Sequence, residues 1–250
     1  MTVAAIVQAR MGSTRLPGKI LQELGGKPVL AHVLNRCRAI PSVDTVVCAV
    51  PDEAASAPVE KIARECGVRV ARGPEKDVLD RYLRAGREAG ADVVLRVTSD
   101  CPLIDPAICD AVLTLRHRES ADYAANNMPA SFPHGLDCEA FTLAALAEAG
   151  EKAIAAEDRE HVTPWLRRAP HLRRVNLANE AGDQTGYRWT LDYPEDLAFF
   201  RALFAAMPEA ENSPANAIVD FLTRRPEISA INASRRDLRP ADAGVSVRPR

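Results

Sequence analysis

The sequence predicts an α/β protein with one mostly parallel sheet that carries helices on both faces. Over the first 120 residues, short β-branched runs alternate with amphipathic helical stripes. The stretches between successive runs are long enough for the crossover helices that join parallel strands. The runs themselves barely alternate between apolar and polar residues, which is typical of strands buried on both faces.

Four strands and four helices are expected in this part of the chain. The strands are placed at residues 3–7, 45–50, 68–71 and 92–98. Between them apolar side chains recur at helical spacing, and helices are placed around 29–37, 59–66, 78–83 and 106–115. Gly67 stands where it would end the second helix, and Asp105 with Pro106 would begin the fourth.

The alternation breaks at Tyr123. A turn is expected at 126–129, strand-like runs at 135–141 and 172–177, and a helical segment at 156–168 that can kink at Pro164. The α/β pattern returns with a strand at 187–191 and a helix from Pro194. We therefore expect a single domain over 1–232, in which 123–186 is an excursion from the core. Residues 233–250 hold five arginines and no apolar period, which is typical of a mobile tail.

Composition excludes several classes of protein. The 32 basic and 34 acidic residues nearly cancel, so the chain has no overall field for a nucleic acid or a membrane surface. Its apolar runs are far shorter than the ~18–20 residues that span a bilayer. The six cysteines lie far apart with no Cys-x-x-Cys pair, which indicates reduced thiols in a cytoplasmic protein.

The most informative segment is the loop at residues 9–19, which directly follows the first strand. An open parallel sheet binds ligands beyond the carboxyl ends of its strands. The loop contains two glycines and three cations, so its backbone can approach a phosphate while Arg and Lys balance the charge. It is not a P-loop, because five residues separate Gly12 from Gly18 where that motif has four. The segment predicts an anion-binding loop.

Two aspartates predict a metal site beside this loop. Asp100 follows the fourth strand, and Asp192 follows the strand expected at 187–191. Magnesium prefers oxygen ligands and is commonly held by one or two carboxylates together with substrate phosphates. Each aspartate could instead cap the helix that follows it. Asp105 serves the first of those helices better, which leaves Asp100 for the metal.

These segments together resemble the sugar-acid cytidylyltransferases, the acylneuraminate and 3-deoxy-manno-octulosonate enzymes, and most of all their SpsF-like spore-coat-polysaccharide relatives. The matching segments cover most of 1–207 and are residues 9–19, 26–30, 49–52, 77–82, 96–106, 135–139 and 189–197. The resemblance implies a Rossmann-like fold of the nucleotide-diphospho-sugar transferase type, with 123–186 as an inserted acceptor-binding and dimerisation element. It also implies transfer of CMP from CTP to a sugar acid of the nonulosonic or ulosonic type. Pyrophosphate would leave, Mg²⁺ would assist, and a homodimer would act in surface polysaccharide biosynthesis.

The resemblance also assigns roles to individual residues. Lys19, Arg15 and Asp100 would be catalytic, and Asp100 and Asp192 would hold the metal. The nucleotide would be bound by Ala9, Arg10, Met11, Gly12, Ser13, Lys19, Asp52, Arg72, Asp77 and Ser99. The acceptor would be bound by Asp137, Glu139, Arg159 and His161.

Simpler roles remain open for several of these residues. Asp52 could be an ordinary turn residue, Asp77 could cap a helix, and Arg159 could lie on a solvated helix face. Tyr193 directly follows Asp192 where the acylneuraminate enzymes carry a second nearby acid, so either one or two metal ions fit. Two other functions fit the same loop: nucleotidyl transfer to a phosphorylated or other small acceptor, and nucleotide binding without catalysis.

Overall fold

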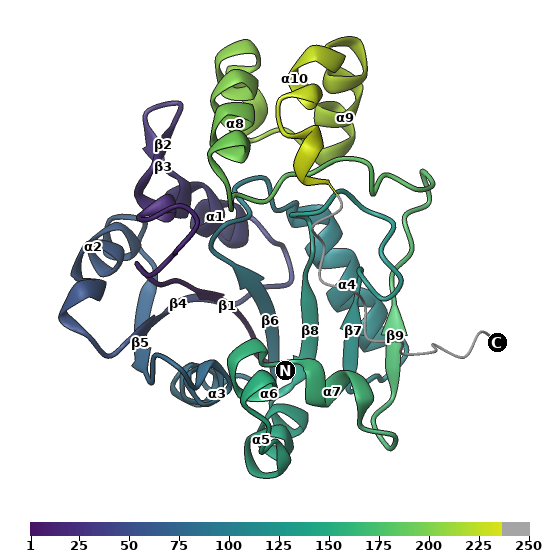
Figure 1. The fold of residues 1–250 in the computed structure, drawn as a ribbon. Coiled ribbons are helices and arrows are strands. Elements are labelled where there is room, and N and C mark those ends of the chain that lie inside the picture. The colour runs from purple at the N-terminus through teal and green to yellow at the C-terminus, as the bar shows by residue number, and fades with distance from the viewer. Residues whose placement is uncertain (237–250) are drawn as a thin grey trace.

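The computed structural model describes residues 1–236 and is built around one central sheet (Figure 1). Within these residues the sheet has seven strands, in the order β5-β4-β1-β6-β8-β7-β9. Their bounds are β1 Val3–Gln8, β4 Thr45–Pro51, β5 Arg69–Gly73, β6 Val93–Thr98, β7 Tyr123–Ala125, β8 Glu139–Thr142 and β9 Arg174–Asn176. Strand β8 runs antiparallel to β6 and β7, and the other neighbouring pairs of this sheet are parallel. The predicted α/β class with a mostly parallel sheet is confirmed.

The register aligns the carboxyl ends of the central strands. Gln8 at the end of β1 pairs with Ala49 of β4 on one side and with Thr98 of β6 on the other. The residues that follow these strands therefore meet at one edge of the sheet, which we call the carboxyl edge. Strand β8, being antiparallel, begins at this edge instead of ending there.

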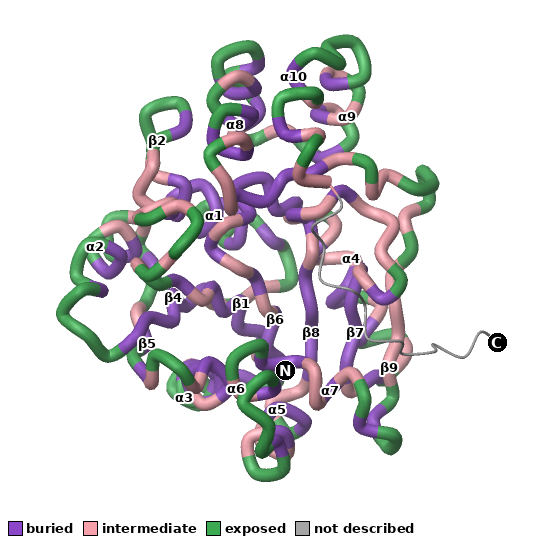
Figure 2. The backbone as a smooth tube through the Cα atoms, in the orientation of Figure 1, coloured by how far each residue is buried: buried purple, intermediate pink, exposed green. Residues whose placement is uncertain are grey.

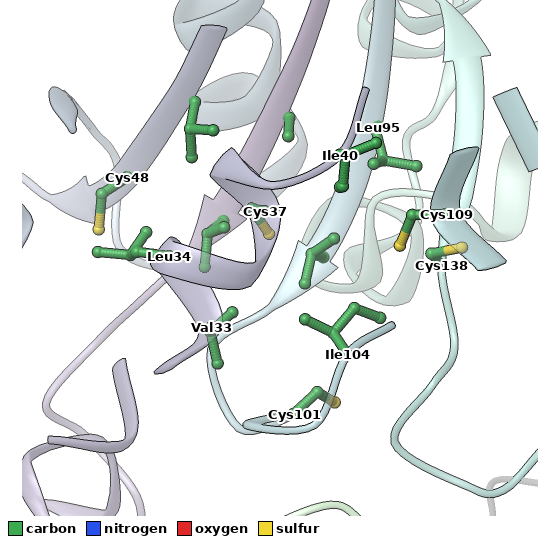
Figure 3. Packing of buried hydrophobic residues seen from close by; sticks show 14 of the residues in the cluster. Val33, Leu34, Cys37, Ile40, Cys48, Leu95, Cys101, Ile104, Cys109 and Cys138 are labelled. Atoms are coloured by element: carbon green, nitrogen blue, oxygen red, sulfur yellow. The ribbon is translucent and has the colours of Figure 1, made fainter. Parts of the chain in front are cut away.

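Helices cover both faces of the sheet, as the sequence predicts. Successive residues of β1 enter two different apolar clusters, with Ala5 in one and Ile6 in the other, because side chains alternate across a strand. Helices α1 (Val29–Arg38), α2 (Ala57–Glu65) and α4 (Pro106–Arg118) pack on the first face. Helices α3 (Val78–Glu88) and α5 (Leu143–Lys152) pack on the second. Figure 2 shows the central strands buried, and Figure 3 shows part of the first cluster around Val33, Leu34 and Cys37 of α1.

A third apolar cluster lies beyond the carboxyl edge. It joins α8 (Pro194–Ala206), α9 (Ala215–Arg224) and α10 (Pro226–Ala230), which form a group at the top of Figure 1. The hairpin of β2 (Glu23–Leu24) and β3 (Lys27–Pro28) contributes Leu24 to this cluster. The predicted apolar stripe of α8 is confirmed, since Leu197, Phe200 and Phe204 are buried.

The predicted helix boundaries at Gly67 and Asp105 are also confirmed. Gly67 follows α2 with a φ of 67°, a left-handed conformation that glycine adopts readily. Asp105 caps α4 by accepting hydrogen bonds from the backbone N–H groups of Ala107 (2.8 Å) and Ile108 (3.1 Å). Its other oxygen accepts from the N–H of Ala215 at 2.6 Å, so the same carboxylate fastens the start of α9.

Two sequence predictions are wrong. Residues 187–191 form no strand of the sheet, and Arg188 makes only an isolated bridge with His134. Trp189 and Leu191 are apolar because they pack in the third cluster. A short apolar run of this kind looks the same in sequence as a buried strand. Residues 123–186 are not an excursion from the core, since they supply β7, β8 and β9 to the sheet.

Two further segments differ in detail. The helical segment at 156–168 is broken into α6 (Ala156–His161) and α7 (Pro164–Arg168), with Val162 between them at a φ of 70°. At the other end, residues 233–236 pack against the fold: η4 (Ala233–Arg235) is a 3₁₀ turn. The remainder of the predicted tail, 237–250, lies outside the described residues. Over residues 1–236, no helix is long and apolar enough to cross a membrane.

Candidate active site

The glycine-basic loop leads into a short 3₁₀ helix, η1 (Lys19–Leu21), that fixes the position of Lys19. Gly18 precedes it in a left-handed conformation, with a φ of 67°, and accepts a hydrogen bond from the N–H of Leu21 at 2.9 Å. Ile20 is buried in the first apolar cluster. The turn and this anchor hold the backbone, so the Lys19 side chain leaves it from a defined point at the carboxyl edge.

The Lys19 ammonium lies between the two aspartates. Its Nζ is 2.6 Å from Oδ2 of Asp100 and 2.9 Å from Oδ1 of Asp192. Arg15 adds a second cation, with Nη2 2.7 Å from the same Oδ1 of Asp192. The structure thus brings together the four residues for which catalysis or metal binding is predicted, although 173 positions separate Lys19 from Asp192.

Charge dominates the proton affinities in this cluster. Burial raises the pKa of Asp100, but the Lys19 ammonium and hydrogen bonds from Lys19 and Thr98 outweigh it and hold the pKa at about 2. The pKa of Asp192 is lowered in the same way, with burial again opposed by Lys19. For Lys19, burial lowers the pKa, but Asp100 and Asp192 prevail and raise it. A carboxylate with so low a pKa is a poor proton acceptor at neutral pH, so Asp100 suits a ligand role better than that of a general base.

Asp192 is held at this point by hydrogen bonds, since its segment is not a strand. The N–H of Leu191 donates to the backbone oxygen of Asp100 at 2.8 Å, which ties the two aspartate segments together. Beyond it, Oδ2 of Asp196 accepts from the N–H groups of Asp192 and Tyr193, both at 3.0 Å.

A buried ion pair that the sequence patterns do not predict lies next to Asp192. Arg188 Nε lies 2.9 Å from Oδ1 of Asp196, and both side chains are almost completely buried. Arg188 Nη2 also approaches Oδ2 of Asp192, at 3.4 Å. The sequence contains the four-residue spacings from Arg188 to Asp192 and from Asp192 to Asp196. Arg188, however, falls in the apolar run at 187–191, which predicts a strand and not a helical turn.

The donor set fits a magnesium ion. Carboxylate oxygens of Asp100 and Asp192 converge on a single ammonium group, so both can face one cation. In residues 1–236, no group of three or more His, Cys, Asp or Glu side chains is placed to hold a metal. Two carboxylates completed by substrate phosphates are the usual arrangement for magnesium in a nucleotide site.

The remaining residues of the loop line the carboxyl edge. Ala9 is buried, and its N–H donates to the oxygen of Ala49 at 3.0 Å. Arg10 and Gly12 are exposed, whereas Met11 and Ser13 are half-buried. Ser13 Oγ accepts from the N–H of Leu16 at 3.3 Å and so shapes the loop itself.

The other predicted nucleotide-binding residues also follow strands at this edge. Arg72 and Asp52 are exposed at the ends of β5 and β4, and they pair with each other at 3.3 Å. Arg72 also pairs with the buried Glu60, at 2.5 Å. Ser99 is buried at the end of β6, next to Asp100.

The structure joins Asp77 and Arg159, for which separate nucleotide and acceptor roles are predicted. Arg159 Nε donates to Oδ2 of Asp77 at 2.9 Å, and its Nη1 donates to the oxygen of Gly150 at 2.7 Å. Asp77 Oδ1 caps α3 by accepting from the N–H of Asp80 at 2.9 Å. Both side chains are therefore engaged in holding α6 against α3. His161 is exposed at the end of α6.

Glu139 and Asp137, also predicted to bind the acceptor, lie at the start of β8. The Glu139 carboxylate is almost completely buried, 2.6 Å from Arg96 and 2.7 Å from Arg167. Burial raises its pKa, but these two guanidinium groups prevail and hold it at about 2. Asp137 is half-buried near the carboxyl edge, and its Oδ2 accepts from the N–H of Gly135 at 2.9 Å. Of the two, Asp137 is the better placed to meet a ligand.

Comparison with known proteins identifies related chains over nearly the whole length. The family model described as cytidylyltransferase matches residues 4–215. Spore coat polysaccharide biosynthesis protein SpsF of Bacillus subtilis (strain 168) is 32% identical, over 89% of this chain and 94% of the relative. The 3-deoxy-manno-octulosonate cytidylyltransferase of Anaeromyxobacter sp. (strain Fw109-5) is 29% identical, over 82% of this chain and 98% of the relative.

Solved structures share the fold. A cytidylyltransferase from Leptospira borgpetersenii serovar Hardjo-bovis (strain JB197) superposes with a TM-score of 0.86 at 31% identity, over 92% of this chain and 97% of that one. CMP:2-keto-3-deoxy-manno-octonic acid synthetase, solved in complex with CTP, superposes with a TM-score of 0.62 at 20% identity, over 82% of this chain and 99% of that one.

Proposed function

Because the chain belongs to the cytidylyltransferase family, we propose that it transfers CMP from CTP to a hydroxyl group of a sugar acid, with release of pyrophosphate. The observation that carries this proposal is the convergence of three side chains at the carboxyl edge. Lys19 Nζ lies 2.6 Å from a carboxylate oxygen of Asp100 and 2.9 Å from one of Asp192. A triphosphate needs both cations and a metal site around its phosphates, and this cluster supplies the two together.

The residues of the chain divide the work of the reaction. The Lys19 ammonium has three N–H donors, of which Asp100 and Asp192 accept two, so one can reach a phosphate oxygen. Arg15 is half-exposed beside it and adds positive charge where the phosphoryl oxygens gain negative charge. Exposed backbone N–H groups of the loop, including that of Gly12, complete the anion site. The chain thereby aligns the α-phosphate with the attacking hydroxyl and the leaving pyrophosphate.

Asp100 and Asp192 would hold the metal ion, for which we propose Mg²⁺. When bound there, the ion supplies charge neutralisation and a template for the phosphates. The low pKa of Asp100 supports this role, because the carboxylate is ionised throughout the neutral range and needs no deprotonation before it binds a cation.

The acceptor is proposed to be a sugar acid of the ulosonic or nonulosonic type, activated for surface polysaccharide synthesis. Two of the relatives support this choice by name, SpsF of Bacillus subtilis and the 3-deoxy-manno-octulosonate cytidylyltransferase of Anaeromyxobacter. Among the residues proposed to bind the acceptor, Asp137 has the most support, because it is half-buried and lies just before β8, which begins at the carboxyl edge.

We also propose a cytoplasmic homodimer assembled through the α5–α7 region of residues 123–186. Ile154, between α5 and α6, is 94% exposed and lies in this region, where a second copy would cover it. Light scattering at micromolar concentration should give twice the mass of the 27.1 kDa chain, and a monomeric mass would contradict the proposal.

Pyrophosphate release tests the proposed reaction. The protein is incubated with Mg²⁺ and CTP, UTP, ATP or GTP, each with a 3-deoxy-ulosonic acid, a nonulosonic acid or a sugar 1-phosphate. We expect release only with CTP and a sugar acid, and none from the Asp100→Asn variant, which keeps the side-chain shape but removes the charge. Release with a sugar phosphate alone would instead favour nucleotidyl transfer to a phosphorylated acceptor. Binding of CTP without release from any acceptor would favour a non-catalytic nucleotide-binding protein.

A further inference from the structure

The C-terminal end of the described chain reaches back to the active site. Asn232 lies beyond residues 4–215, which the family model matches, and stands two residues after the end of α10. Its side chain is buried, with only 2% of the residue exposed. The side-chain amide donates to the backbone oxygen of Arg188 at 2.9 Å and to Oδ1 of Asp196 at 3.0 Å. A carbonyl and a carboxylate can only accept, so the amide nitrogen must face them, and both of its N–H donors are used.

Asp196 transmits this contact to the predicted metal ligand. Its Oδ1 accepts from Asn232 and from Arg188 Nε, and its Oδ2 accepts from Arg188 Nη2. The same Oδ2 accepts from the backbone N–H groups of Asp192 and Tyr193. The orientation of the carboxylate thus helps to decide where the Asp192 backbone lies. Asn232 and Arg188 fix that orientation together, and Asn232 acts at Oδ1, the oxygen that does not contact the Asp192 backbone.

A second residue of the same segment contacts the other side of this turn. The Arg235 guanidinium stacks on the Tyr193 ring, with its Cζ 4.3 Å from the ring centroid. Arg235 Nη2 also lies 2.9 Å from Oε1 of Glu195. Tyr193 directly follows Asp192, so residues 232–235 hold the turn both from beneath and from its outer surface.

We propose that Asn232 is a positioning residue for Asp192, so that the C-terminal segment completes the catalytic centre. This inference rests on the proposed function, in which Asp192 binds a divalent cation. Without the amide, Asp196 Oδ1 loses one of its two donors and the Arg188 oxygen loses its side-chain donor. The carboxylate can then rotate and release the Asp192 and Tyr193 amides. Replacing a residue that orients a metal ligand typically lowers metal affinity about 10–100-fold.

Mn²⁺ binding in the presence of CTP tests the inference without reference to turnover. Free Mn²⁺ is measured by electron paramagnetic resonance for the wild type and for the Asn232→Ala and Asn232→Leu variants. Asn232→Leu keeps the side-chain volume and removes the donors, so it separates hydrogen bonding from packing. Asn216→Ala, an exposed asparagine on α9, is the matched control. We expect about tenfold weaker Mn²⁺ binding or more for both Asn232 variants and no change for the control. Unchanged Mn²⁺ affinity in folded Asn232 variants would overturn the inference.

Hydrogen exchange gives a second readout that does not depend on metal. Peptides that contain residues 188–196 should exchange faster in the Asn232 variants, whereas peptides around Asp100 should not. Should the two variants fail to fold, Asn232→Ser, which retains a shorter hydroxyl donor, replaces them in both measurements. Failure of the proposed function would appear separately, as wild-type protein that binds no Mn²⁺ with CTP. In that case unchanged exchange at 188–196 would overturn the role of Asn232, and faster exchange would support it.

Discussion

Replacing Lys19 by methionine isolates the charge at the centre of the site. Methionine has nearly the same length and fills the same space, but it leaves Asp100 and Asp192 without the ammonium that now lies 2.6 and 2.9 Å from them. In the wild type the pKa of Asp100 falls from 3.8 to about 2, and Lys19 is the chief cause opposing burial. At ~1.4 kcal/mol per pKa unit, the shift corresponds to about 2 kcal/mol of folding stability at neutral pH.

The sign of the pH dependence follows from the direction of this shift. A carboxyl with a folded-state pKa below its unfolded value stabilises the fold above pH ~4, and this contribution is lost as the pH falls toward 2. Without Lys19, burial still raises the pKa of Asp100, and the hydrogen bonds from Thr98 and the backbone remain to lower it. We therefore expect Lys19→Met to lower Tm by about 4–8 °C at pH 7 in the absence of metal, and to lose less stability than the wild type below pH 4.

The same variant tests catalysis. If Lys19 stabilises charge that develops in the transition state, kcat for pyrophosphate release should fall by ~10²-fold or more. Lys61→Met is the control, because the Lys61 side chain is 76% exposed on α2. It should change neither kcat nor the dependence of Tm on pH. An unchanged kcat in Lys19→Met would remove Lys19 from the mechanism, and an unchanged profile of Tm against pH would refute the ion-pair argument.

Three further changes, the first with a control variant, probe the frame around the site. Gly135→Ala should destabilise the fold severely, since Gly135 has a φ of 110° and an added Cβ would lie 2.3 Å from the Trp189 backbone. Gly182→Ala, with a φ of 90° but open space, should cost only about 1 kcal/mol, so similar Tm losses in a circular dichroism melt would contradict the steric argument. Glu139→Leu should cost about 3–5 kcal/mol in urea unfolding, because it leaves the half-buried Arg96 and Arg167 without their anion. It should also weaken the loss of stability below pH 4, because the pKa of Glu139 is held at about 2. Asp105→Ala removes the cap of α4 and the tie to Ala215, and should cost about 1–2 kcal/mol; a Tm within 1 °C of the wild type would show that the cap is dispensable.

The part of the candidate site that lies directly after parallel strands could be predicted from the sequence. Lys19 and Asp100 could be placed together because parallel strands end at one edge, and the register of β1 with β6 bears this out. The cap at Asp105 was predictable because it depends on residues a few positions apart. Local patterns and the rules of parallel sheets suffice for such features.

The rest depends on contacts between distant residues. Residues 187–191 have the apolar character of a strand, but the hydrogen-bonding capacity of the sheet is taken by β8, an antiparallel strand from residues 139–142. Glu139 shows the same limit. The family resemblance assigns it to acceptor binding, whereas Arg96 across the strand pair and Arg167 from α7 neutralise it inside the fold. A local sequence pattern cannot predict these two partners, because Arg96 and Arg167 are 43 and 28 residues away from Glu139.

Stability alone gives a poor account of the buried pair of Arg188 and Asp196. Burying two charges costs several kcal/mol per ion, and well-packed apolar residues of similar volume are often as stable or more stable. The pair is useful in a different way, because Asp196 also binds the amides of Asp192 and Tyr193, which an apolar side chain could not do. A second link comes from Arg36 of α1, which donates to the backbone oxygens of Ile104 and Ala210, at 3.3 and 2.6 Å. It joins the segment after Asp100 to the turn that follows α8. Asp100 is thus fixed from the sheet and Asp192 from the C-terminal layer. The distance between the two carboxylates proposed to bind the metal therefore depends on how firmly these two parts are fastened together.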